Sequence, residues 1–228
     1  MDALLEEIDN LKLLENNYRH IEFELGSTDP SLFRIARETH HGLYRAMVQA
    51  LRGTANIAIT GKPKDKTRTA RYTRDRAPWV EIHRVPVPGC RKAWRYSEPS
   101  PCTPPEMLPS RSQPTQVEDY LLGFYDLLAM IQRECFMGHY MMSKPVPVTD
   151  SEMQTLEWVH EDIRNEYEHF VPKTYLAPRD DLRRASLICV DLTLRLLRDS
   201  GNVFGSDLPQ GILQLIERCH SKLTEPEF

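Results

Sequence analysis

The sequence predicts an all-α protein, an up-and-down bundle of five to six helices with one basic, proline-rich insertion. Over most of the chain, apolar residues recur at steps of three and four, the spacing of one buried helix face. Between residues 54 and 115 this spacing is replaced by short β-rich pieces separated by glycine, proline and charged residues. We therefore expect one helical domain over residues 1–228, with residues 54–115 inserted into it.

The first two predicted helices are separated by a turn at residues 26–30. The first helix carries one apolar stripe, formed by Leu4, Leu5, Ile8, Leu11, Leu14, Tyr18 and Ile21. Gly26 ends it, and the following Ser-Thr-Asp-Pro run supplies capping side chains and a proline suited to a first helical turn. The second helix covers residues 31–51 and ends at Gly53.

The predicted insertion contains three candidate strands, at residues 56–60, 79–87 and 93–96. Eight of the 17 prolines fall between Pro86 and Pro114, so residues 98–114 are predicted to form a loop or a semi-extended linker. A small β-hairpin is one arrangement that these strands allow.

The remaining helices are predicted at residues 117–142, 152–170, 179–200 and 212–223. The first of these is strongly apolar and is expected to be a central core helix. Thr149 and Glu152 form a capping pattern before the second, and Pro172 ends it. Gly201 is the end signal of the third.

Composition excludes several broad classes of protein. The net charge of −4 is not that of a polycation that grips nucleic acid indiscriminately, and no apolar run approaches the roughly 18 residues of a membrane span. The acidic N-terminus lacks the cationic start of a secretory signal. The five cysteines lie far apart and form no C-x-x-C pair. We expect a cytoplasmic protein with reduced thiols, no contact with a membrane and no metal or other cofactor.

The sharpest local pattern is the R-N-x-x-x-H motif of Arg164, Asn165 and His169. Asn165 and His169 are four residues apart and share one helix face, away from the apolar stripe, and Arg164 lies at the edge of that face. A histidine can take the proton of a 2′-hydroxyl or return one to the leaving oxygen, because its pKa lies near neutral pH. An arginine can make paired hydrogen bonds to a phosphate. The motif therefore suits RNA cleavage without a metal.

A structural explanation of the motif stands beside the catalytic one. Arg164 could pair with Asp162 or Glu168 on a solvated face, and His169 could favour the helix C-terminus as a cation. The acidic neighbours Glu166 and Glu168 would repel an RNA backbone if they faced it.

The stretch of residues 162–170, with its R-N-x-x-x-H core, resembles the HEPN superfamily, whose signature is an arginine, a polar residue, three variable positions and a histidine on a helix of an α-bundle. The resemblance covers the helical body and leaves the insertion unexplained. Many members are metal-independent endoribonucleases, toxins or defence effectors that act as dimers. The resemblance implies that His169 is the acid/base, Arg164 the phosphate stabiliser and Asn165 an orienting residue. It also implies a homodimer, RNA as substrate and an antitoxin or regulator as partner.

The strongest charge asymmetry lies in residues 62–95, which hold 11 basic and three acidic residues with tryptophan and tyrosine among them. Basic residues follow a phosphate backbone, and aromatic faces accept unstacked bases. As candidate RNA-binding residues we take Lys62, Lys64, Lys66, Arg68, Arg71, Arg74, Trp79, Arg91, Lys92 and Trp94. The alternative is a solvated loop whose charges pair with the acidic body and whose tryptophans pack inward.

The second predicted helix carries another polar cluster, with His40 and Tyr44 four residues apart and His41 and Arg45 likewise. No H-E-x-x-H pattern accompanies them, so they are expected to be structural histidines. His160, four residues before Arg164, could line the same cleft or fill a core edge, and we favour the second.

The combined prediction is a HEPN-type, metal-independent endoribonuclease related to toxins or defence systems. The alternative is a non-catalytic module of the same type that binds RNA, a nucleotide or a partner protein. A purely structural helical interaction protein is a third, weaker possibility.

Overall fold

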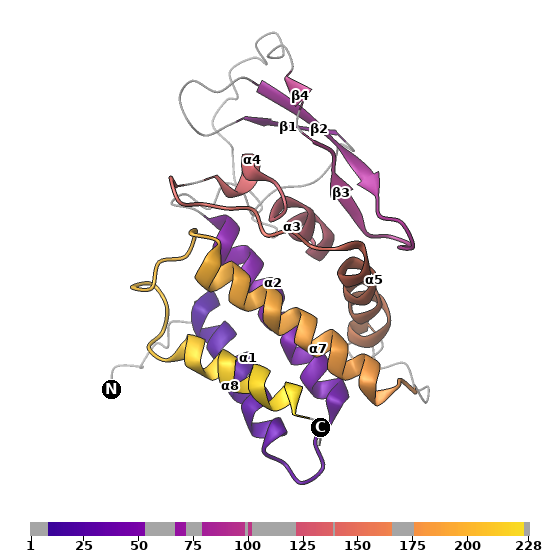
Figure 1. Cartoon of the computed structure of the whole chain (residues 1–228), viewed down its shortest axis with the longest axis vertical. Coiled ribbons are helices and arrows are strands. Elements are labelled where there is room, and N and C mark those ends of the chain that lie inside the picture. Colours follow the sequence, from indigo (N-terminus) through magenta and orange to yellow (C-terminus); the bar gives the residue numbers. More distant parts are fainter. Residues whose placement is uncertain are drawn as a thin grey trace, which may run out of the picture.

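The computed structural model describes residues 9–52, 67–71, 79–98, 100–101, 122–138, 140–165 and 176–225. Within these ranges the chain is mostly α-helical and carries one small antiparallel sheet (Figure 1). The predicted fold class is confirmed.

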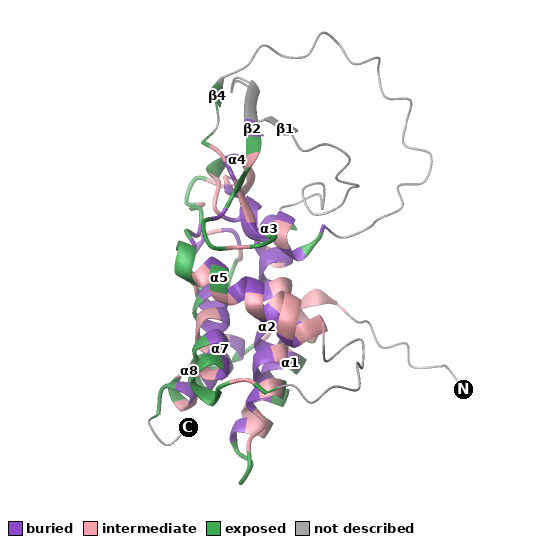
Figure 2. Cartoon of the chain, turned by 90° about the vertical axis from the view of Figure 1, so that its right-hand side faces the viewer, coloured by how far each residue is buried: buried purple, intermediate pink, exposed green. Residues whose placement is uncertain are grey.

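The bundle is built from four helices: α1 (Asn10–Leu25), α2 (Leu32–Arg52), α7 (Arg179–Leu194) and α8 (Ile212–Thr224). Helix α1 packs on α2 and α8, and α7 packs on the same two helices, so α2 lies in the interior of the group. Buried residues run along most of α2, as Figure 2 shows, and include Leu43, Met47 and Leu51. The three–four spacing of apolar residues in the sequence is the pattern that places them there.

Several helix ends agree with the sequence signals. Gly26 caps α1. Thr149 and Glu152 form a capping box at the start of α5 (Asp150–Trp158), in which each side chain bonds to the other's backbone N–H. Gly201 has a φ of +70°, a conformation that glycine adopts without steric cost.

The prediction of one central helix over residues 117–142 is wrong for the described part of that range. Two short helices form instead, α3 (Phe124–Met130) and α4 (Glu134–Met137). Between them Arg133 has an extended backbone, and its guanidinium donates to the Tyr96 carbonyl at the edge of the sheet. The apolar residues of this stretch are buried between the bundle and the sheet, so their spacing does not follow one straight helix face.

The helix predicted at residues 152–170 changes its winding part of the way along. After α5 the chain continues as the π-helical segment η1 (Val159–Arg164), which packs on α2. A second π-helical segment, η2 (Arg195–Asp199), extends α7. Such wider turns inside helices are rare and occur frequently at functional sites.

The sheet consists of β1 (Thr67–Arg71), β2 (Trp79–Pro86), β3 (Trp94–Tyr96) and β4 (Ser100–Pro101). All pairs are antiparallel: β2 pairs with β1, β3 and β4. The strands predicted near residues 79–87 and 93–96 are confirmed as the β2–β3 hairpin. Strand β1 was not predicted, and residues 56–60 lie outside the described ranges.

The hairpin turn between β2 and β3 begins with Val87, whose N–H donates to the Ala93 carbonyl, and includes Gly89 with a φ of +79°. Among the described helices, none has a stretch long and apolar enough to cross a membrane.

Candidate functional site

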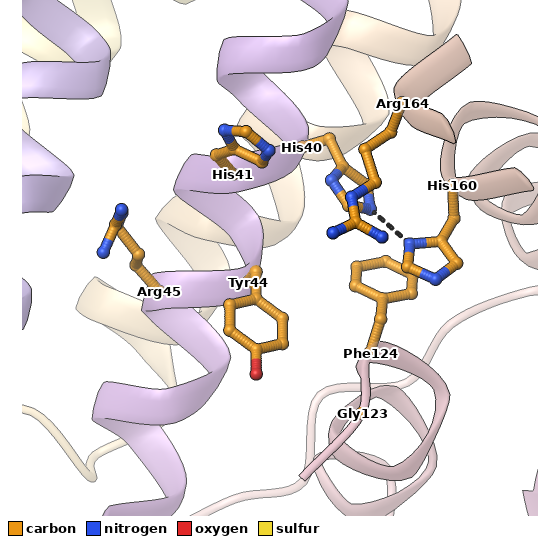
Figure 3. Close-up of a pocket in the computed structure, with 8 residues that line it drawn as sticks. All are labelled: His40, His41, Tyr44, Arg45, Gly123, Phe124, His160 and Arg164. Carbon is orange, nitrogen blue, oxygen red and sulfur yellow. Dashed lines mark hydrogen bonds between the residues drawn. The ribbon is translucent and has the colours of Figure 1, made fainter. Parts of the chain in front are cut away.

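A cavity of about 400 Å³ lies where α2, the start of α3 and the segment η1 meet (Figure 3). Its described lining consists of His40, His41, Tyr44, Arg45, Gly123, Phe124, His160 and Arg164. Two guanidinium groups and three imidazoles thus share one small space. No described lining residue is aspartate or glutamate, so the lining is cationic or neutral.

The arginine of the R-N-x-x-x-H motif is part of this cavity. Arg164 is the last residue of η1, and its Nη1 donates to Oδ1 of the adjacent Asn165 at 3.3 Å. Figure 3 shows the Arg164 side chain extending towards His40 and His160. His169 lies outside the described residues, so two of the three predicted catalytic residues are placed, and Arg164 is the one that lines the cavity.

Beside Arg164, two histidines from distant parts of the chain meet. His160 Nδ1 lies 3.1 Å from His40 Nε2, so one of these atoms donates a hydrogen bond to the other. His40 is only 2% exposed. Its Nδ1 is buried and has no hydrogen-bond partner within the described part of the chain. The Phe124 ring stacks on the His160 ring, with 4.7 Å between the ring centroids, and also contacts the His40 ring.

This environment keeps His40 neutral. Burial is the main cause that lowers its pKa well below the ordinary value of 6.5, and the nearby His160, His41 and Arg164 lower it further. A neutral imidazole carries one N–H and one lone pair, so it can donate to one partner and accept from another.

Arg45 lines the cavity from α2, and a hydrogen bond to Asn17 of α1 holds its guanidinium. Its Nε donates to Oδ1 of Asn17 at 2.8 Å, and Nδ2 of Asn17 donates to Glu38 Oε2 at 2.5 Å. Burial lowers the pKa of Arg45, although an arginine remains charged in proteins. On the same helix, the Tyr44 hydroxyl donates to the Leu122 carbonyl at 2.8 Å, which links α2 to the start of α3.

Two of the basic residues predicted to bind RNA, Arg91 and Lys92, form ion pairs with acidic residues. Arg91 Nη2 lies 2.9 Å from Asp162 Oδ2, and Lys92 forms an ion pair with Glu161. For these two residues, the alternative of charges that pair with the acidic body is the arrangement present in the structure. Trp94 is partly buried against the core, and the Arg84 guanidinium lies 4.0 Å from the centre of its ring.

The other predicted RNA-binding residues cannot be placed as side chains. Lys62, Lys64, Lys66 and Arg74 lie outside the described ranges. Arg68 and Arg71 belong to β1, and Trp79 begins β2. The acidic residues Glu166 and Glu168 of the motif also lie outside the described ranges.

The structure brings together residues that the sequence reasoning had set aside. His40 and His41 are predicted to be structural histidines, Arg45 belongs to the same polar cluster, and His160 is predicted to fill a core edge; all four line the cavity with Arg164. The signal available in the sequence was the four-residue spacing of His40 with Tyr44 and of His41 with Arg45, which places each pair on one side of α2. Phe124 carries no such signal, because it is one of many apolar residues in that part of the sequence.

Within the part of the chain that the structure describes, no group of three or more histidine, cysteine, aspartate or glutamate side chains is arranged to hold a metal ion. Comparisons of this chain with protein-family models, with curated proteins and with solved structures find no match.

Proposed function

We propose that the protein is a metal-independent endoribonuclease of the HEPN type, with its active site at this cavity. The observation that carries the proposal is the position of Arg164, the arginine of the R-N-x-x-x-H motif, in a cavity lined by three histidines and a second arginine. The sequence motif and the cavity share this residue.

The proposed reaction uses the RNA's own 2′-hydroxyl as nucleophile. The 2′-oxygen attacks phosphorus and loses its proton to a base, and the bond from phosphorus to the 5′-oxygen breaks as that oxygen gains a proton. The products are a 2′,3′-cyclic phosphate and a 5′-hydroxyl. Arg164 would stabilise the charge that develops on the phosphate, Asn165 would orient it, and His169 would transfer a proton.

The biological setting is proposed from the family resemblance alone. It comprises a homodimer that joins the motifs of two protomers, an RNA substrate, and a role in a toxin–antitoxin or defence system with an antitoxin or regulator as partner.

A non-catalytic module that binds RNA or a nucleotide is the second candidate. It is supported by the cavity itself, in which the buried His40 is hydrogen-bonded to His160 and shapes the wall of a site that a ligand could occupy.

The test is cleavage of a mixed RNA pool in the presence of EDTA by the wild type and by the Arg164→Met and His169→Ala variants. We expect the wild type to cleave and each variant to lose about 10²- to 10³-fold in rate, the usual effect of removing one group that stabilises or protonates the transition state. Arg198→Gln is the matched control, because Arg198 is half-exposed and pairs with Asp199 and Glu217.

Circular dichroism establishes that each variant is folded. An absence of cleavage by the wild type, or equal cleavage by the folded variants, would leave the binding module as the remaining candidate.

A further inference from the structure

Three elements bound the cavity, and each pair of them is joined by a side-chain hydrogen bond. Helix α2 is joined to the start of α3 through the Tyr44 hydroxyl, and it is joined to η1 through the contact of His40 with His160. The third bond closes the triangle: the Tyr125 hydroxyl of α3 donates to Glu161 Oε1 of η1 at 3.0 Å.

We propose that Tyr125 and Glu161 are positioning residues of the proposed active site. Their hydrogen bond ties η1, which carries His160 and Arg164, to α3, which carries Phe124. Neither Tyr125 nor Glu161 belongs to the described lining of the cavity, so they act on the reaction through the residues that do. The link to catalysis rests on the proposed function, whereas the effect of this bond on the wall of the cavity does not.

Both groups have the ionisation state that this hydrogen bond needs. Burial, followed by the charge of Glu161, raises the pKa of the Tyr125 hydroxyl, which therefore keeps its proton at neutral pH. Burial alone would raise the pKa of Glu161, but hydrogen bonds from Lys92 and Tyr125, together with nearby positive charge, outweigh it and lower the pKa. A protonated phenol thus donates to a charged carboxylate, and such bonds are about twice as strong as bonds between neutral groups.

The Tyr125 ring also lies directly against His160. The two rings meet edge to face, with 5.1 Å between their centroids and 74° between their planes. Phe124 covers the face of the same imidazole, at an angle of 12° (Figure 3). Since Glu161 follows His160 in the chain, the hydroxyl bond and the ring contact act on adjacent residues of η1. With the bond to His40, these contacts hold the imidazole in one orientation.

Lys92, the other partner of Glu161, contributes less to this arrangement. It comes from the hairpin turn, and its side chain is 64% exposed, whereas that of Glu161 is 12% exposed. Water can replace an exposed ammonium at little cost, because exposed ion pairs contribute little to stability. Lys92→Gln therefore removes one partner of Glu161 and leaves the bond between α3 and η1 intact, which makes it a matched control.

The first experiment measures RNA cleavage in the presence of EDTA by variants of the two residues. Tyr125→Phe loses only the hydroxyl and Glu161→Leu loses the acceptor, so each should lower kcat by about tenfold or more with little change in KM, because misplaced reacting groups slow the chemical step. Glu161→Gln keeps an acceptor oxygen for Tyr125 and should recover most of the rate. Because both single changes break the same bond, the double variant Tyr125→Phe with Glu161→Leu should be no slower than either one.

The second experiment does not depend on cleavage. In protein labelled with ¹⁵N at histidine, the chemical shifts of the His160 ring nitrogens report the tautomer and the hydrogen bonding of the ring. We expect them to change in Tyr125→Phe and to keep their wild-type values in Lys92→Gln. Tyr140→Phe is a second control, since its ring packs on Phe204 and is not part of the described lining. Urea denaturation establishes that each variant is folded.

The inference is overturned if folded Tyr125→Phe cleaves RNA at the wild-type rate, or if its His160 signals coincide with those of the wild type. If Tyr125→Phe fails to fold, the comparison of Glu161→Leu with Glu161→Gln tests the same bond from the side of η1. Failure of the proposed function gives a different result: the wild type cleaves no RNA, yet the His160 signals move in Tyr125→Phe and stay in place in the two controls.

Discussion

The segment η1 carries basic residues on one side and acidic residues on the other, and the two sides make different contacts. On one side Arg164 and His160 line the cavity, whose described lining contains no carboxylate. On the other side Glu161 and Asp162 receive Lys92 and Arg91 from the turn of the β2–β3 hairpin. The charged residues of this region therefore divide into a set that holds the hairpin on the helix and a set that lines the cavity.

The fastening side is centred on Glu157 of α5, which is only 4% exposed. Its carboxylate accepts backbone N–H groups of Arg91 at 2.7 Å and of Ala93 at 2.8 Å, and also that of Lys92. Burial alone would raise the pKa of Glu157, but these three donors, together with the charge of Arg91, outweigh it and lower the pKa. The hairpin is therefore fixed to the helix mainly through its backbone, with the exposed side-chain ion pairs around it.

The largest loss of stability is expected for the variant Glu157→Ala. We expect the free energy of unfolding to fall by about 2–4 kcal/mol, because three backbone donors lose a charged acceptor in a buried position. Urea denaturation measures the change. The control is Glu217→Ala, an exposed carboxylate in a surface ion pair with Arg198, which should change stability by less than about 1 kcal/mol. Equal effects of the two variants would contradict the assigned role of Glu157.

The burial of His40 in the wall of the cavity predicts that the free energy of unfolding depends on pH. Burial lowers the pKa of His40 well below 6.5, so between that pKa and 6.5 the unfolded chain binds a proton that the folded chain does not. Its contribution to stability is therefore complete above about pH 6.5 and is lost as the pH falls below it.

The measurement is urea denaturation at intervals between pH 7.5 and pH 5.5, for the wild type and for His40→Gln. Through this group, the free energy of unfolding of the wild type should fall by up to about 1.4 kcal/mol per pH unit. In His40→Gln this contribution to the pH dependence should be absent. His83→Gln, at an exposed position of β2, is the control and should keep the slope. A wild-type slope that survives His40→Gln would assign the titration to another group.

The smallest effect is expected for the double variant Arg91→Gln with Lys92→Gln. Each side chain is about two-thirds exposed, and such ion pairs contribute roughly 0–1 kcal/mol each and weaken with salt. The variant should remain folded and should cleave RNA at the rate of the wild type. A loss of cleavage as large as the loss caused by Arg164→Met would show that the hairpin charges belong to the substrate site.

Much of the fold could be predicted because its signals are local. The apolar spacing of α1, α2, α7 and α8 and the capping box at Thr149 depend only on neighbouring residues, and they gave helix positions close to those observed. The failure at residues 122–138 has a non-local cause. Arg133 bonds to the Tyr96 carbonyl, 37 residues earlier in the sequence, and apolar residues buried on several sides carry no helical period to show the break.

The site was predictable only in part. The motif contains Arg164, which lines the cavity, and the catalytic roles of Arg164, Asn165 and His169 stay predictions. No pattern in the sequence connects His40 with His160, which are 120 residues apart, although His160 Nδ1 lies 3.1 Å from His40 Nε2 in the structure. The sequence also offers no means to separate Arg91 and Lys92, which pair with acidic residues of η1, from Arg45, which reaches the cavity.

The sequence by itself therefore determined the helical class and most of the helix positions, and it drew attention to the motif of Arg164. The tertiary structure decided which histidines and arginines share a cavity with that arginine, and which basic residues are engaged in fastening the hairpin. The physical reason is that helix formation follows the spacing of neighbouring residues, whereas the surroundings of a charge depend on which distant segments pack against it.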